Sequence, residues 1–299
     1  MYNVAAIGEC MVELREGRGG KFVRAFGGDT LNTAIYLSRL GVPTSYITAL
    51  GDDQISEEML VAWQSEGIDT RLVHRAEGRL PGLYILHNDK DGERRFSYWR
   101  DQSPARDIFA SENMHLAEAL LQYDWIYFSG ISLSLYGTEG RARLFDTLQR
   151  ANDAGAWIVF DTNFRKQGWP DYREADLAFR KAIEMADVLF ASHDDMHGVF
   201  GRASIAIFEN APCVEKVLKL QDASARLIWH GKEEIVAPLP VKKIVDTTAA
   251  GDSFAAAYLA ARIAKKSPLM AAADGHRLAN KVIQHQGAII PRNKMPKLK

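Results

Sequence analysis

The chain has few of the residues that build small covalently linked or metal-held frameworks. Cys10 and Cys213 are its only cysteines among 299 residues, and its eight histidines show no HExxH or similar spacing. A disulfide scaffold needs more cysteines, and a zinc site needs closely spaced cysteine or histidine ligands. We expect neither. Two unpaired thiols favour a reducing environment, and no leader pattern precedes the first apolar strand, so we predict a cytoplasmic protein.

An excess of charge of one sign is also missing. The 37 Lys and Arg residues nearly balance 38 Asp and Glu residues, so no nucleic-acid or membrane-surface partner is predicted. The most apolar run, residues 254–264, is too short to cross a membrane and contains Arg262. The serine-containing segment 128–132 lacks the GxSxG pattern, which argues against a hydrolase triad. A small anionic ligand would therefore be bound by local groups.

Apolar runs alternate with helical patterns along the chain, most regularly after residue 120. The predicted strands are residues 4–8, 22–26, 46–50, 125–131, 157–160, 188–191 and 227–230. The predicted helices are residues 31–40, 55–66, 139–152 and 179–185. Two long C-terminal helices follow, the first from 254 to 264. Segment 201–214 is expected to be irregular. Alternating strands and helices predict an α/β fold with a mostly parallel central sheet that has helices on both faces.

A β-hairpin interrupts this alternation. Residues 83–87 and 95–100 are rich in β-forming side chains and flank an Asp/Gly turn at 88–93. Core packing accounts for most of the aromatic residues, but an exposed ribbon with this many aromatic and arginine side chains is expected to cover something. Arg100, which follows Tyr98 and Trp99, is a candidate ligand-binding group.

The stretch 245–254 reads VDTTAAGDSF and precedes the apolar helix predicted at 254–264. Small residues leave backbone N–H groups accessible, and the unpaired N–H groups at a helix start bind anions. Asp252 beside such a site would be placed to remove a proton from a hydroxyl. These are the parts that phosphoryl transfer requires. The alternative is structural: Asp252 or Ser253 could simply cap the helix.

Two other polar clusters stand at predicted element ends. Residues 27–34 read GGDTLNTA, where the glycines allow close backbone approach and Asp29 and Asn32 occupy the first turn of a helix. These side chains either cap the helix or face a hydroxyl-rich ligand. Residues 161–165 follow a predicted strand, and ligands of such sheets bind at the carboxyl ends of the strands. Arg165 could there pair with a carboxylate or phosphate, or form a surface ion pair.

Together, residues 27–34 and 245–254 resemble the two signatures of the ribokinase-like (PfkB) sugar kinases, and the resemblance covers nearly the whole chain. Four strings are similar to the branch that acts on 2-keto-3-deoxygluconate: GECM at 8–11, RLPGLY at 79–84, YWR at 98–100 and GAIIPR at 287–292. The resemblance implies a three-layer ribokinase-like unit over residues 1–299. A small β-sheet lid would come from about 14–27 and 82–101, and its open edges would be a surface for a homodimer.

The resemblance also implies an activity and its residues. ATP would phosphorylate the 6-hydroxyl of 2-keto-3-deoxygluconate; fructose or ribose phosphorylation, or a sugar-acid sensor, are alternatives. Asp252 would be the base, and the amides of Ala249, Ala250 and Gly251 would hold the moving phosphoryl group. The family's sugar-binding positions are Gly28, Asp29, Asn32, Tyr84, Tyr98, Arg100, Arg165 and Asp252. Its nucleotide-binding positions are Asn163, Arg165, Ser192, Lys219, Ser224, Ala249, Gly251 and Asn280. Mg²⁺ would be held mostly by phosphate oxygens and water, and no metal site made of protein ligands alone is expected.

One segment departs from the family pattern. A glycine-rich turn, KxGxxG, usually follows the lysine that corresponds to Lys219, but here Gln221 and Ser224 replace the two glycines. If these positions need a positive φ, each replacement costs on the order of 1–2 kcal/mol. Asp222 adds a negative charge near the expected polyphosphate. This segment therefore predicts weakened ATP binding.

Overall fold

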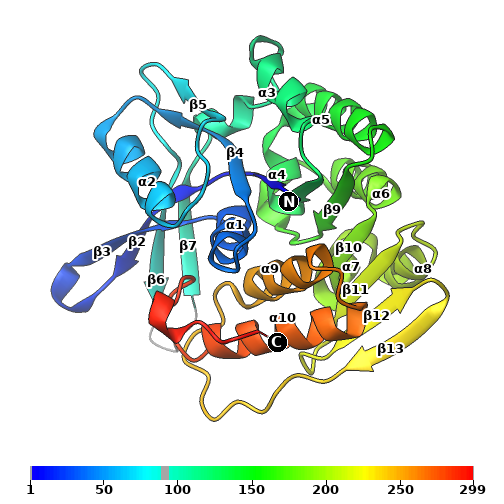
Figure 1. Ribbon diagram of the computed structural model, residues 1–299. Helices are drawn as coiled ribbons and strands as arrows, with labels where there is room; N and C mark the ends of the chain where they lie inside the picture. The colour runs from blue at the N-terminus through cyan, green and yellow to red at the C-terminus, as the bar shows by residue number, and fades with distance from the viewer. Residues whose placement is uncertain (1, 89–93, 299) are drawn as a thin grey trace.

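A large sheet crosses the centre of the computed structural model, which describes residues 2–88 and 94–298 (Figure 1). Within these ranges it has nine strands in the order β13-β12-β11-β10-β9-β8-β1-β4-β5. They are β1 (Val4–Ile7), β4 (Thr44–Gly51), β5 (Val73–Ala76), β8 (Trp125–Ser129), β9 (Trp157–Asp161), β10 (Val188–Ser192), β11 (Glu215–Lys219), β12 (Ala225–Trp229) and β13 (Lys232–Val236). The seven strands β5, β4, β1, β8, β9, β10 and β11 are parallel to one another. Strands β12 and β13 extend the sheet beyond β11 in antiparallel pairing.

Helices cover both faces of the large sheet. They are α1 (Asp29–Arg39), α2 (Gln54–Ser65), α3 (Met114–Leu120), α4 (Gly130–Leu135), α5 (Gly137–Asp153), α6 (Tyr172–Met185), α7 (His193–Phe200), α8 (Ser204–Glu209), α9 (Ala250–Ile263) and α10 (Pro268–Val282). Successive residues of β1 point to opposite faces: Val4 and Ala6 pack with α1, α2, α9 and α10, whereas Ala5 and Ile7 pack with α3 to α8. Burial on both faces explains why β1 reads as an unbroken apolar run.

A separate small sheet lies beside the large one, at the left of Figure 1. In the described part of the chain it consists of β3, β2, β6 and β7 in that order. Their bounds are β2 (Met11–Glu16), β3 (Phe22–Gly27), β6 (Leu83–Asn88) and β7 (Arg94–Trp99). The pairs β2–β3 and β6–β7 are antiparallel, and β2 and β6 are parallel. The sheet joins the large one where β1 runs into β2.

The structure confirms the predicted α/β class with its mostly parallel sheet and a smaller second sheet. Some details differ. Strand 125–131 was predicted two residues too long, because the Ser129 hydroxyl accepts a hydrogen bond from the Ser132 amide (3.3 Å) and starts α4. Segment 201–214, expected to be irregular, contains α8. Strands β2, β5, β11 and β13 were not predicted. The expected turn at 89–93 lies outside the described residues.

None of the helices that the structure describes combines the length and the apolar character needed to cross a membrane.

Candidate active site

The two sequence signatures, about 220 residues apart, meet where α1 and α9 begin. The Asn32 side-chain amide donates to Asp252 Oδ2 (2.9 Å), and the Thr33 hydroxyl donates to the Asp252 carbonyl oxygen (3.3 Å). The helices pack against each other on one face of the large sheet. Their N-termini thus point into the same space, which places an acidic side chain between two sets of free helix amides.

Helix α1 can begin at this point only because residue 28 is glycine. Gly28 is the N-cap in an extended conformation, and a Cβ there would overlap the carbonyl oxygen of Glu9. The turn brings Asp29 to the first helical position and Asn32 one turn later. The Asp29 carboxylate accepts a hydrogen bond from the Asn163 side-chain amide (2.8 Å), which ties α1 to the segment after β9.

The start of helix α9 does not match the alternative in which Asp252 or Ser253 caps the helix. Its N-cap is Ala249, in the left-handed conformation (φ 59°), and no side chain caps the helix. Asp252 is the third helical residue, and its side chain is bonded to Asn32 instead of the local backbone. Capping by Asp252 or Ser253 is therefore wrong. The carboxylate is directed out of its own helix, toward the space shared with α1.

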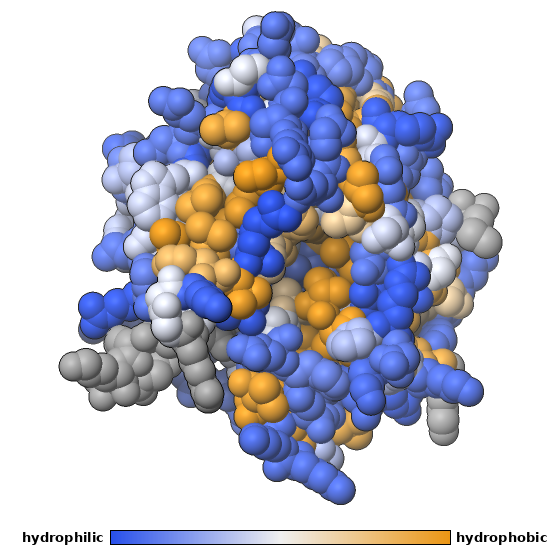
Figure 2. Space-filling model, turned by 90° about the vertical axis from the view of Figure 1, so that its left-hand side faces the viewer, coloured by the Kyte–Doolittle hydropathy of each residue, from blue (hydrophilic) through white to orange (hydrophobic). Residues whose placement is uncertain are grey.

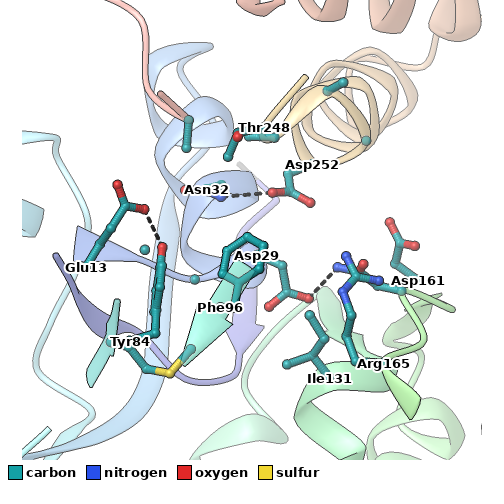
Figure 3. Close-up of a pocket in the computed structure, with 18 of the residues that line it drawn as sticks. Glu13, Asp29, Asn32, Tyr84, Phe96, Ile131, Asp161, Arg165, Thr248 and Asp252 are labelled. Atoms are coloured by element: carbon teal, nitrogen blue, oxygen red, sulfur yellow. Dashed lines mark hydrogen bonds between the residues drawn. The ribbon is translucent and has the colours of Figure 1, made fainter. Parts of the chain in front are cut away.

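That space is a cavity of about 650 Å³ (Figure 3). The large sheet and α1 form one side, the small sheet forms another, and the loop before α9 closes a third. Figure 3 shows Asp252, Asn32 and Thr248 on one side, opposite Glu13 and Tyr84 of the small sheet, with Asp29 and Phe96 between them. The predicted residues that line it are Gly28, Asp29, Asn32, Tyr84, Tyr98, Asn163, Arg165, Lys219, Ala249, Ala250, Gly251 and Asp252.

Carboxylates crowd around Asp252, and one lysine lies among them. The pKa of Asp252 is raised to about 7, mainly by burial and also by the nearby Asp29 and Asp161 charges, while the Asn32 hydrogen bond and Lys219 act to lower it. Burial also raises the pKa of Asp161, although Lys219 Nζ lies 3.5 Å from its Oδ1. A carboxylate with a pKa near neutrality is well suited to accept a proton from a hydroxyl.

The comparisons with known proteins agree with this geometry. The model for the pfkB family of carbohydrate kinases matches residues 1–295. The chain belongs to this family. It is 41% identical to the 2-dehydro-3-deoxygluconokinase of Escherichia coli K12, over 98% of each chain. Among solved structures, it resembles a 2-dehydro-3-deoxygluconokinase of Thermotoga maritima (TM-score 0.80, 22% identity, 97% and 96% of the chains). It also resembles an ATP-bound fructokinase of Xylella fastidiosa (TM-score 0.84, 20% identity, 99% and 95% of the chains).

On the small-sheet side, each residue that the family resemblance assigns to sugar binding contacts a neighbouring side chain. Tyr84 donates a hydrogen bond to Glu13 from the neighbouring strand β2. Tyr98 stacks on Phe96 with ring centres 6.0 Å apart. Arg100 does not line the large cavity; it pairs with Glu9 and lines a smaller cavity of about 290 Å³ beside it.

The residues expected on the nucleotide side of this family are more dispersed. Asn163, Arg165 and Lys219 line the large cavity, together with the loop before α9. Asn163 bonds to Asp29 of the sugar side. Arg165 Nη1 lies 3.9 Å from Asp195 Oδ1, and 55% of the Arg165 side chain is exposed.

Three further nucleotide-side residues do not line the large cavity. The Ser192 hydroxyl accepts from the Asp195 amide and caps α7. Ser224 bonds to Asp222 in the turn between β11 and β12. The Asn280 side chain donates to the carbonyl oxygens of Leu239 and Pro240. Their assignment to nucleotide binding stays a prediction.

The turn at 219–225 does not carry the backbone strain that the missing family glycines suggested. Within it the positive φ falls on Ala223 (63°), not on Gln221 or Ser224. The Asp222 carboxylate accepts from the Ser224 amide (2.9 Å) and hydroxyl (2.5 Å), and the Leu220 amide donates to the Ser224 carbonyl oxygen (2.9 Å). These bonds close a compact hairpin turn without glycine, so the two replacements are not a reason to expect backbone strain at their own positions.

Sequence reasoning missed several cavity residues. They are Met11, Glu13, Gly27, Phe96, Ile131, Gln167, Thr247, Thr248 and Ala288. Strand alternation could have placed Glu13 on the same face of the small sheet as Tyr84, had β2 been predicted. Asp161 was placed at the site with the rest of segment 161–165, by the rule that ligands bind at the carboxyl ends of strands, but no role was predicted for it.

Proposed function

We propose that the chain transfers the γ-phosphoryl group of ATP to the 6-hydroxyl of 2-keto-3-deoxygluconate, the compound also called 2-dehydro-3-deoxygluconate. The observation that carries the proposal is Asp252, held by Asn32 (2.9 Å) at the start of α9 in a cavity with its pKa raised to about 7. The 41% identity to the E. coli enzyme over 98% of both chains supports this choice of substrate.

In this reaction Asp252 accepts the proton of the 6-hydroxyl while the sugar oxygen attacks the γ-phosphorus and ADP departs. Asn32 holds the carboxylate in place through its hydrogen bond. The amides at the start of α9 would receive the negative charge of the moving phosphoryl group, which is the role predicted for Ala249, Ala250 and Gly251. Ala250 also donates to the Thr247 carbonyl oxygen (3.2 Å), which keeps the loop in shape. Lys219 lies close to Gly251 and adds a positive charge there.

Mg²⁺ neutralises phosphate charge in this class of reaction. The described residues contain no group of three His, Cys, Asp or Glu side chains able to hold a metal ion, so phosphate oxygens and water would supply most of the coordination. Asp161 fits a supporting role, because it is buried and lines the cavity, and its Oδ1 has the Lys219 ammonium 3.5 Å away but no hydrogen-bond partner in the described structure. It would hold water bound to the ion.

Two alternatives are less well supported. A kinase for fructose or ribose would not need arginines near the sugar, yet Arg100 and Arg165 line the small cavity beside the catalytic one. A sugar-acid sensor without turnover would not need Asp252, Lys219 and the α9 loop to face one cavity, as they do. The cytoplasm supplies the ATP that the reaction consumes, and we place the enzyme there.

A coupled assay of ADP release tests the proposal. Purified protein with Mg·ATP is given 2-keto-3-deoxygluconate, fructose, ribose or gluconate. We expect turnover only with the keto-deoxy acid. Equal or better turnover of fructose or ribose would show that the proposed substrate is wrong. Binding of the sugar acid without ADP release would favour the sensor.

We further propose a homodimer through the small sheet, which would act as a lid. Trp99 (59% exposed) and Leu80 (64%) border a groove of about 540 Å³ on this side of the molecule. Figure 2 shows apolar residues gathered around a hollow on the face that contains the small sheet. Sedimentation should show a dimer for the wild type and a monomer for Trp99→Glu. A monomeric wild type, or a dimeric variant, would contradict this proposal.

A further inference from the structure

The small cavity of about 290 Å³ adjoins the large one and differs from it in charge. Both cavities are lined by Gly28, Asp29, Tyr98 and Arg165. The large cavity holds the carboxylates around Asp252. The small one lacks Asp252 and, in the described part of the chain, is lined by Arg100, Arg106 and Arg165. Three acids of the described ranges, Glu9, Asp29 and Asp101, also line the small cavity, so its acids and arginines balance. Within the same ranges the large cavity has four acids, Glu13, Asp29, Asp161 and Asp252, against Arg165 and Lys219. A sugar that carries a carboxylate at one end and reacts at the other would therefore place its carboxylate among the three arginines, where repulsion by acids is weaker.

Two of the three arginines have reduced influence on a ligand. Arg100 is paired with Glu9, whose side chain is only 1% exposed, so most of its charge is already compensated. Arg165 lies 3.9 Å from Asp195, and more than half of its side chain is exposed to water. Water screens the charge of an exposed group strongly.

Arg106 differs from both. Its side chain is half-buried and lines the small cavity, yet it forms no hydrogen bond or ion pair with any other residue of the ranges 2–88 and 94–298. Its positive charge acts on Glu9, which is already paired with Arg100. Because its donors have no partner among the described residues, this half-buried guanidinium is free to bind an anion.

The backbone that carries Arg106 is firmly held. Arg106 lies on the 3₁₀ helix Pro104–Asp107, and the neighbouring Ala105 and Ile108 are completely buried. Ser103, just before this helix, is also buried. Arg100, by contrast, directly follows strand β7 of the small sheet. If the small sheet moves as a lid, Arg106 keeps its place and Arg100 need not.

We infer that Arg106 is a specificity-determining residue that binds the carboxylate of the sugar acid. The inference rests on the proposed function and adds to it a residue that neither signature contains. In this arrangement Arg106 supplies a positive charge that no protein carboxylate neutralises. Arg100, held in place by Glu9, helps to orient the bound carboxylate. The neutral part of the sugar is bound by other groups, so the contribution of Arg106 is confined to substrates with a carboxylate.

The test compares 2-keto-3-deoxygluconate with its neutral counterpart, the same six-carbon sugar with an aldehyde in place of the carboxylate. In Arg106→Gln, kcat/KM for the acid should fall about 10- to 100-fold, the range for losing a charged hydrogen bond, mainly through KM. The value for the aldehyde and the KM for ATP should change less than about threefold. Arg106→Lys should recover part of the loss.

Arg79→Gln is the matched control, because Arg79 pairs with Asp107 (3.2 Å) beside the same 3₁₀ helix and does not line the small cavity. It should leave both substrates unchanged. Equal loss for the acid and the aldehyde in Arg106→Gln would show a structural role and overturn the inference, as would an unchanged acid-to-aldehyde ratio.

Calorimetric binding of the acid without ATP separates this inference from the proposed function. Wild type that binds the acid but releases no ADP would contradict the proposed kinase, and weaker binding by Arg106→Gln would still support the carboxylate site. Turnover with no effect of Arg106→Gln would overturn the site alone. No binding of the acid by the wild type would overturn both.

Discussion

At the scale of single residues, the site depends on charges that the fold forces into low-dielectric surroundings. Asp252, Asp161 and Glu9 are all nearly buried, and burial is the largest cause that raises the pKa of each. Such groups reduce stability when they are ionised, but they supply basicity and orientation where the reaction needs them. Activity and stability should therefore respond in opposite directions to their removal.

Asp252→Asn should show this opposition. Losing a positioned base should lower kcat by roughly 10²–10⁴-fold, while KM changes little. In the wild type, kcat/KM should rise with pH through the Asp252 pKa of about 7, because the base must be ionised.

The stability effect has a definite sign. The folded pKa of about 7 lies above the ordinary value of 3.8, so wild-type stability is full below the ordinary value and falls as pH rises to the folded one. Asp252→Asn should therefore be more stable than the wild type at about pH 8, by on the order of 4 kcal/mol, with little difference at about pH 4. Denaturant unfolding at both pH values measures it; equal differences at the two pH values would contradict it.

Arg100 and Arg165 should behave differently when they are removed. Arg100→Ala leaves Glu9 buried without its partner and should destabilise the fold by about 3 kcal/mol. Adding Glu9→Gln removes the stranded charge and should restore most of that loss. Arg165→Ala should change stability by less than about 0.5 kcal/mol, because its side chain is 55% exposed. Urea unfolding of the four proteins tests this; an undiminished loss in the double variant would mean that packing, not charge, is responsible.

At the scale of elements, the starts of α1 and α9 solve the same problem in two ways. Each helix must present free amides at the cavity without a capping side chain. Helix α1 uses Gly28 to let the backbone pass close to Glu9. Helix α9 uses Ala249 in the left-handed region, where a Cβ is unfavourable. The tight turn thus stores strain next to the reacting groups.

Ala249→Gly should relieve this strain and stabilise the protein by about 1 kcal/mol. The next residue is the matched control. Ala250 is the first residue of α9, so Ala250→Gly should destabilise by about 0.5–1 kcal/mol or less. Thermal unfolding of the two variants measures the contrast, and a loss of stability in both would show that the left-handed conformation carries no such cost.

At the scale of the whole molecule, both cysteines report on cooperative unfolding. Cys10 is 2% and Cys213 9% exposed, and burial raises the thiol pKa of both, that of Cys213 to about 12. Buried, protonated thiols react poorly. A thiol reagent should label neither in the native protein, and both should be labelled at the rate of global unfolding. Fast labelling of Cys10 alone would show local opening at the base of the small sheet.

Much of the fold could be predicted from the sequence because the relevant forces are local or periodic. Apolar runs such as residues 4–8 and 157–160 identify buried strands, and the signatures at 27–34 and 245–254 identify two helix starts and an acidic group between small residues. Strand β2 was missed, since its residues alternate between the two faces of a small sheet and include charged side chains such as Glu13. Glu13 was lost with it.

The sequence by itself therefore determined the α/β class, the order of most elements and the residue types at the two signatures, because backbone preference and apolar periodicity act over a few neighbouring residues. Only the tertiary structure decided that Asn32 binds Asp252, that Glu9 neutralises Arg100, and that the positive φ within 219–225 falls on Ala223 and not on Gln221 or Ser224. It also decided that Arg106 has no such partner among the described residues. Charge pairing and burial depend on which distant segments meet, and no local pattern encodes them.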